Sequence, residues 1–326
     1  MVRADSSGSA VAAGRGSSVG PVPLPAVHRP PVGDLGLLLV AVLAVSTSGP
    51  LIAAAAAPSL AIAFYRNAMA SGLLLPWALT RCRAELRALG RREWRLALLA
   101  GVLLAAHFAT WTPALALTSV ASATALVATQ PVWAALIAHL RGSTISRRAW
   151  LGIAVAVSAA ALLSGIDSAV SPRALAGDAL AVVGGIFAAM YVSTGAEARR
   201  SLSTTTYTLV CYSTASVLLL VGCLVGRAQL GGYRPVTWLQ LLALTAGAQL
   251  LGHSVINRVL RTTSATVVSL AILLEVPGAA LIAAVFLNQR PPAAALPAAA
   301  LLLVGIGLVV GVRGGRGELP APLDVD

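Results

Sequence analysis

Two charged residues stand alone inside long uncharged regions of this sequence. Arg66 is the only charged residue between positions 35 and 80, and Glu275 is the only one between 262 and 289. A guanidinium group binds carboxylates and phosphates through a planar set of donors, and a carboxylate in an apolar region is neutral unless it is paired. We therefore predict that Arg66 receives an anionic group of a substrate and that Glu275 takes up and releases protons. Purely structural roles, with Arg66 anchored on backbone carbonyls or on Glu275, are the alternative.

A second group of candidate site residues is a stripe of polar side chains. Gln249, His253 and Asn257 recur every four residues, so they share one face of a helix. His107 and Trp111 have the same spacing on another predicted helix. Polar faces of membrane helices contact protein or water rather than lipid. These five residues are therefore predicted to line a substrate cavity, with simple packing of each histidine as the alternative.

Prolines interrupt several of the same regions. Pro50, Pro113, Pro131 and Pro277 remove backbone hydrogen bonds and free carbonyl groups for neighbours or ligands. Pro50, Pro131 and Pro277 are predicted hinges or broken-helix binding elements, and a tolerated kink in a packed bundle is the alternative.

Motifs for catalysis are absent from the sequence. There is no His-Glu-x-x-His, no Gly-rich phosphate loop, no Asp-rich magnesium motif and no serine elbow. We therefore predict a protein that is not an enzyme and that has no catalytic residue, cofactor or metal site.

The composition indicates that these residues are carried by membrane helices. Hydrophobic residues make up 58% of the 326 positions and charged residues 10%, against roughly 45–50% and 25% in soluble domains. A membrane span needs about 20 apolar residues. The uncharged regions then predict an all-α polytopic membrane protein with ten transmembrane helices: two in 35–80, two in 96–140, and one each in 149–166, 179–196, 201–226, 235–257, 262–289 and 291–312.

The positive charge is explained by orientation in the lipid bilayer rather than by nucleic acid. All 23 basic residues are arginines. With a cytoplasmic amino terminus, eighteen fall in cytoplasmic segments, four in outside loops, and Arg66 in the membrane. This bias predicts a multi-pass protein of the inner or plasma membrane with both termini cytoplasmic. Residues 1–33 and 313–326, rich in small residues, proline and arginine, are predicted to be disordered cytoplasmic tails.

An internal repeat divides the ten helices into two halves. At an offset of 145 residues, 118–140 aligns with 263–285, and Gly33-Asp34 and Gly177-Asp178 open the first and sixth helices. Five helices per half is an odd number, so the second half enters the membrane from the opposite side. The halves, 34–166 and 177–312, are therefore predicted to form the inverted-topology repeat of secondary transporters, with substrate bound at their interface.

The pattern across these helices resembles the EamA-type members of the drug/metabolite transporter superfamily, over about 35–312. The residues that carry the resemblance are Phe64-Tyr65-Arg66-Asn67, His107-Phe108-Ala109-Thr110-Trp111, Gln130-Pro131-Val132, Gly252-His253-Ser254 with Asn257, and Glu275-Val276-Pro277. The family's Leu-Gly-Glu after the fourth and ninth helices is replaced by Leu140-Arg141-Gly142 and Leu287-Asn288-Gln289. This leaves Glu275 as the main candidate for ion coupling.

The resemblance implies a permease that works by alternating access. The expected function is proton-coupled efflux of a small organic metabolite or drug, driven by the proton gradient. A non-transporting membrane sensor or assembly protein on the same fold is the alternative. Gly307-x-x-x-Gly311 permits close helix approach, either within the chain or in a homodimer.

Overall fold

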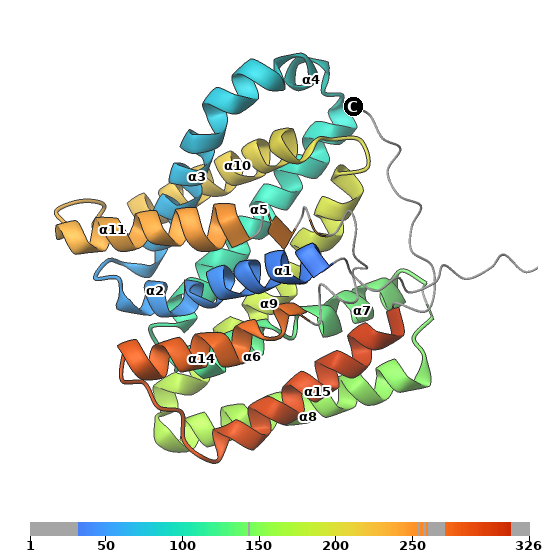
Figure 1. Ribbon diagram of the computed structural model, residues 1–326, viewed down its shortest axis with the longest axis vertical. Coiled ribbons are helices and arrows are strands. Elements are labelled where there is room, and N and C mark those ends of the chain that lie inside the picture. Colours follow the sequence, from blue (N-terminus) through green and yellow to red (C-terminus); the bar gives the residue numbers. More distant parts are fainter. Residues whose placement is uncertain (1–31, 143, 253–254, 257–258, 260–270, 314–326) are drawn as a thin grey trace, which may run out of the picture.

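The computed structural model describes residues 32–142, 144–252, 255–256, 259 and 271–313. Every regular element in these residues is helical, and the part of the chain so described contains no strand (Figure 1). The predicted tails at 1–33 and 313–326 lie outside it except for their innermost residues. The prediction of an all-helical protein is therefore confirmed for the described residues.

The described residues of the first half form eight helices. Some of these helices are successive segments of an interrupted span. The eight helices are α1 (Val32–Ser46), α2 (Ser48–Ala54), α3 (Ser59–Arg81), α4 (Arg83–Ala88), α5 (Arg91–Ala114), α6 (Val120–Val127), α7 (Gln130–Leu140) and α8 (Arg147–Val170).

The second half continues from α8 after the single residue Ser171. Its described elements are α9 (Pro172–Ala198), α10 (Thr204–Val225), α11 (Pro235–Ala243), the π-helix η1 (Leu244–Gly252), α14 (Glu275–Phe286) and α15 (Ala295–Arg313). Because α8 and α9 extend to this junction, Asp167 and Asp178 lie inside helices, where the charge pattern alone predicted a loop between 166 and 179.

Within the described residues, six helical stretches are long and apolar enough to cross a membrane. They are Leu35–Ala54, Arg91–Ala114, Val120–Leu140, Arg147–Asp167, Pro172–Gly195 and Thr204–Val225, and α14 and α15 are shorter apolar helices. Large apolar side chains such as Leu39, Leu73 and Leu281 are exposed on the outside of the molecule, which is the surface that lipid requires. The chain is thus a membrane-spanning protein, while the crossing of α3, α11–η1, α14 and α15 stays a prediction.

Serine side chains begin three of the helices. The hydroxyl oxygens of Ser119, Ser146 and Ser203 accept backbone N–H groups at the starts of α6, α8 and α10. Such caps satisfy donors that a helix cannot pair internally. Glu85 of α4 strengthens the start of α10, since its carboxylate accepts the Ser203 N–H at 2.7 Å and the Thr206 hydroxyl at 2.7 Å.

Glycines allow the closest helix contacts. Helices α8 and α15 lie side by side along their lengths (Figure 1). A Cβ atom at Gly305 would lie 2.6 Å from the backbone nitrogen of Ala156, and one at Gly152 would lie 2.7 Å from the carbonyl oxygen of Gly305. Any side chain at these two positions would therefore push the helices apart.

Helices α7 and α14 begin at corresponding positions of the two halves. The span of α6 and α7 breaks before Gln130, and α14 begins at Glu275. The offset of 145 residues found in the sequence brings Gln130 onto Glu275. The break between α1 and α2 falls at Thr47.

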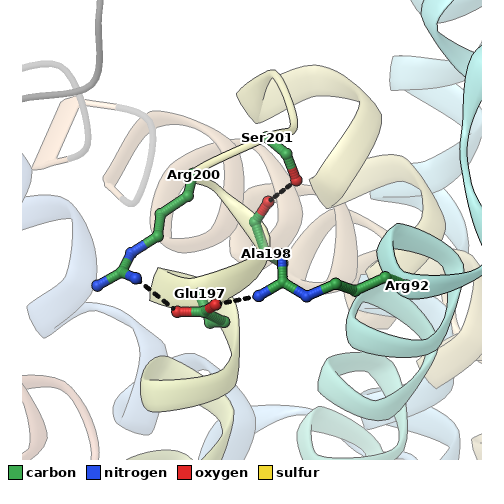
Figure 2. A network of polar contacts seen from close by, with 5 residues as sticks. All are labelled: Arg92, Glu197, Ala198, Arg200 and Ser201. Atoms are coloured by element: carbon green, nitrogen blue, oxygen red, sulfur yellow. Dashed lines mark hydrogen bonds and ion pairs between the residues drawn. The ribbon is translucent and has the colours of Figure 1, made fainter.

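Exposed charges connect α5 to the end of α9. Arg92 and Arg200 both pair with Glu197 (Figure 2). The side chains of the two arginines are more than half exposed, and exposed ion pairs contribute about 0–1 kcal/mol. This network therefore joins neighbouring elements at the surface without adding much stability.

Candidate functional site

The guanidinium group of Arg66 is buried in the middle of the molecule. Arg66 lies on α3 and is 2% exposed. Its Nε donates a hydrogen bond to Oε1 of Gln249 at 2.5 Å, and its Nη1 donates to the Ser48 hydroxyl at 3.4 Å. Its Cζ lies 4.4 Å from the ring centre of Phe108, a distance typical of a cation–π contact. Side chains of α2, α5 and η1 thus surround this single cation.

The amide side chain of Asn67 helps to position Gln249, the hydrogen-bond partner of Arg66. Gln249 Nε2 donates to Oδ1 of Asn67 at 3.4 Å, and Asn67 Nδ2 donates to the Ala63 carbonyl at 2.8 Å. This chain of donors leaves the oxygen of Gln249 facing Arg66. Gln249 belongs to η1, and short π-helical segments are frequent at functional sites.

The positive charge of Arg66 is not cancelled by an ion pair. Within the described residues, no carboxylate lies within 4.0 Å of its guanidinium nitrogens. Glu275 is the acidic residue whose charge acts on Arg66, and it is half-buried at the first position of α14. An anion that entered this site would therefore find a desolvated cation on which the charge of Glu275 acts without forming an ion pair.

His107 and Trp111 form the wall beside Phe108. The two rings are stacked, with centroids 5.7 Å apart and an interplanar angle of 12°. His107 Nδ1 lies 2.9 Å from the Gly184 carbonyl oxygen. Because a carbonyl can only accept, Nδ1 carries the proton. A Cβ atom at Gly184 would lie 3.1 Å from the Cβ of Trp111, so the glycine permits this close approach of α5 and α9.

The indole nitrogen of Trp111 has an unused donor. Trp111 is 5% exposed, yet its Nε1 has no hydrogen-bond partner among the described residues. Buried donors without partners are uncommon and costly. A polar ligand that fills this gap would recover the missing hydrogen bond.

The structure brings five of the predicted site residues into one neighbourhood. Arg66 contacts Gln249 directly and acts electrostatically on His107 and Glu275, while Trp111 stacks on His107. His253 and Asn257, the other two members of the predicted stripe, lie outside the described residues. The roles of all seven residues in binding or coupling remain predictions.

Three residues around Arg66 were not predicted from the sequence: Ser48 and Phe108, which contact it, and Asn67, which holds its partner Gln249. Ser48, Asn67 and Phe108 carry no charge and do not repeat with a helical spacing. Asn67 and Phe108 directly follow Arg66 and His107 in the sequence, and this adjacency was the available signal. Ser48 offers no such signal, because its contact depends on how α2 packs.

The three predicted hinge prolines lie near helix starts. Pro131 is the second residue of α7, Pro277 is the third residue of α14, and Pro50 is the third residue of α2. A backbone N–H at these positions would have no acceptor within the helix, so proline is tolerated there. These placements fit interrupted spans, and movement about the prolines stays a prediction.

Two cavities formed by described residues lie away from Arg66. One of about 180 Å³ is lined by Ser122, Leu163, Pro277 and neighbouring alanines and leucines. The other, of about 340 Å³, is lined by Glu85, Glu93 and residues around them. The described part of the chain also has no group of three His, Cys, Asp or Glu side chains placed to hold a metal ion.

Comparison with known proteins identifies the family. The sequence pattern of the EamA-like transporter family matches residues 33–165 and again 175–311. A solved protein crystal structure is 17% identical and superposes with a TM-score of 0.59, covering 87% of this chain and 99% of that one. At this identity the likeness concerns the fold alone, and no curated protein matches the sequence. Because the two matched repeats span most of the chain, the protein belongs to the EamA-like transporter family, within the drug/metabolite transporter superfamily, and is a multi-pass membrane protein.

Proposed function

We propose that this protein is a proton-coupled secondary transporter that exports a small organic metabolite or drug bearing an anionic group. The observation that carries the proposal is the buried, unpaired guanidinium of Arg66, held by neutral partners at 2.5 and 3.4 Å. A fixed cation in a low-dielectric site attracts a carboxylate or phosphate strongly. His107, Trp111 and Gln249 line the same site and select the remainder of the substrate.

Glu275 supplies the coupling in this proposal. The carboxylate acts on Arg66 without pairing with it in this conformation. In this proposal the substrate places its anionic group on Arg66 and a donor group on the ionised carboxylate of Glu275, and a proton on Glu275 removes that acceptor. Proton and substrate therefore exclude each other on the site, and alternating access converts this exclusion into exchange of substrate for protons.

The architecture that goes with this function is ten spans in two inverted repeats. Helix packing supports it: the third span contacts the sixth (α5 with α9) as the eighth contacts the first (η1 with α1), and the fourth contacts the sixth (α6 with α9) as the ninth contacts the first (α14 with α1). Exchange of the two halves maps each contact onto its counterpart. A twofold axis between repeats has this consequence.

Access to Arg66 requires an opening movement. At one end of the bundle, the Tyr65 hydroxyl donates to the Leu230 carbonyl, and the Tyr65 ring lies 4.9 Å from that of Trp238. At the other end, Glu85 binds the start of α10. Alternating access predicts that these two sets of contacts break in turn. With both termini cytoplasmic in the cell membrane, the end that carries Tyr65 faces outward.

The test uses the full-length protein in proteoliposomes with a panel of labelled organic anions. Glu275→Gln should abolish transport driven by a pH gradient while counterflow exchange without a gradient continues. Arg66→Ala should abolish both for carboxylate-bearing compounds. Equal activity of wild type and Glu275→Gln in the two assays would contradict the coupling, and unaffected carboxylate transport in Arg66→Ala would remove its binding role. Glu93→Gln, a change of the same chemistry at the bundle end, serves as control.

A further inference from the structure

Two carboxylates that take no part in the Arg66 site are buried together where α8 ends and α9 begins. Asp167 is 5% exposed and Asp178 is 1% exposed. The two helices pack against each other, and the negative charge of Asp167 acts on Asp178. We call these two residues the acid pair.

Most of the oxygen atoms of the acid pair have nothing to bind. Both carboxylate oxygens of Asp178 and Oδ2 of Asp167 are buried without a hydrogen-bond partner among the described residues. No arginine or histidine of the described chain lies within 4.0 Å of them. Buried carboxylates with neither donors nor a cation are expensive, so the arrangement points to a missing partner.

Hydroxyl groups surround the same space. The side chains of Thr118 and Ser122 flank Asp167, and those of Thr118 and Ser164 flank Asp178. The Thr118 hydroxyl has no hydrogen-bond partner in the described part of the chain, and the Ser122 hydroxyl oxygen accepts from Ser119 at 2.9 Å. Three hydroxyls and two carboxylates from α6, α8, α9 and the turn before α6 thus converge, while three of the four carboxylate oxygens make no hydrogen bond among the described residues.

Close packing of the backbone holds this group together. A Cβ atom at Gly177 would lie 2.8 Å from the backbone nitrogen of Thr118 and 3.0 Å from its Cβ. Only glycine therefore lets α9 approach the turn closely enough for Asp178 to reach Thr118. The same turn is joined to the chain before α15, because the Val120 N–H donates to Gln289 Oε1 at 3.2 Å.

Oxygen atoms that are grouped but not hydrogen-bonded are suited to a hard cation. Calcium and magnesium take six or more oxygen ligands, and hydroxyls and carboxylates are hard ligands that also suit sodium. Adjacent oxygens bound at about 2.4 Å to one ion lie roughly 3.4 Å apart, near the limit of a hydrogen bond. A cation would neutralise the acid pair and satisfy its free oxygens at once.

We propose that Asp167 and Asp178, with Thr118, Ser122 and Ser164, form a binding site for a hard metal cation that joins α6, α8 and α9. Asp167 lies about 4.5 Å along the axis from the end of α8, and Asp178 about 9 Å from the start of α9. The site is therefore close to one end of the bundle. It is separate from Arg66 and Glu275 and does not depend on their role in transport.

The test measures the thermal unfolding of the full-length protein in detergent after removal of metals with EDTA. CaCl₂, MgCl₂ and NaCl are then added in separate titrations, with choline chloride as the control for ionic strength. The expected result is a saturable rise in Tm with one of the three metals, at an apparent Kd on the order of 0.1–1 mM for a divalent ion. Asp178→Asn should weaken this response about tenfold or more, and Glu93→Gln should leave it unchanged.

Two further measurements keep the outcome decisive. Ser164→Ala removes one neutral ligand and should weaken the response severalfold while the fold is retained. In EDTA, Asp178→Asn should unfold at a higher temperature than wild type, because it removes a repulsion that no metal then relieves. Absence of any metal response, a response that survives in Asp178→Asn, or stabilisation by acid alone to which no metal adds would overturn the proposal.

Discussion

Replacement of Gln249 by glutamate places a carboxylate where an amide now meets Arg66. The Gln249 oxygen accepts the Arg66 Nε–H at 2.5 Å, and glutamate has nearly the same shape. Gln249→Glu therefore keeps this hydrogen bond and adds a permanent counter-ion. If Arg66 receives the anionic group of the substrate, the new carboxylate competes for it at every pH at which it is ionised.

The expected weakening of substrate binding follows from the hydrogen bond to Arg66 that the substrate loses. Hydrogen bonds to a charged group contribute about 1.5–3 kcal/mol. Loss of one such bond from the substrate weakens binding by roughly 10- to 150-fold, since about 1.4 kcal/mol corresponds to a factor of ten. Stability should not fall comparably, because the bond that the Gln249 amide nitrogen donates to Asn67 is long, at 3.4 Å.

The assay pairs counterflow exchange in proteoliposomes with Tm in detergent. Gln249→Glu should show a KM raised roughly 10- to 150-fold and a Tm at or above that of wild type. Gln240→Glu makes the same chemical change on α11, where the amide donates to the Ala54 carbonyl at 3.4 Å. This control variant should leave the KM of exchange unchanged.

A different pattern would refute the reasoning about Arg66. Unchanged exchange in Gln249→Glu, together with a higher Tm, would mean that Arg66 is a structural anchor whose charge the substrate never meets. Gln249→Leu tests the structural contribution of the hydrogen bond alone, because it leaves the buried Nε–H of Arg66 without an acceptor. It should lower Tm whether or not Arg66 binds the substrate.

Two further predictions concern stability and are checked by thermal unfolding in detergent. Gly305→Ala should destabilise the protein by about 1–3 kcal/mol, because its Cβ would lie 2.6 Å from a backbone atom of α8; Gly165→Ala, which has open space around it, should be neutral or slightly stabilising. Glu85→Ala should cost about 1–2 kcal/mol, because the start of α10 loses three hydrogen bonds to that carboxylate.

Much of the fold could be predicted from the sequence, because uncharged runs and membrane spans are governed by the same hydration energy. Helices occur in each of the ten predicted regions, and six stretches have the length and hydropathy of spans. The ends of the helices were harder to predict. Asp167 and Asp178 interrupt the uncharged run yet lie inside helices, because α8 and α9 continue to the single residue Ser171 between them.

The charged part of the candidate site could also be predicted, because an arginine in an apolar helix is conspicuous in any sequence. The partners of Arg66 were harder to find. Ser48, Phe108 and Gln249 come from three elements distant in the chain, and only their packing brings them to the guanidinium group. The change from α- to π-helix at Leu244 likewise leaves no mark in residue type or spacing.

Helices α7 and α14 start at equivalent positions of the two halves, but with different chemistry. Gln130 opens α7 and Glu275 opens α14. An amide keeps its hydrogens across the whole physiological pH range, whereas a carboxyl group exchanges one. In the proposed coupling, only the half that carries Glu275 can therefore take up and release a proton at this position.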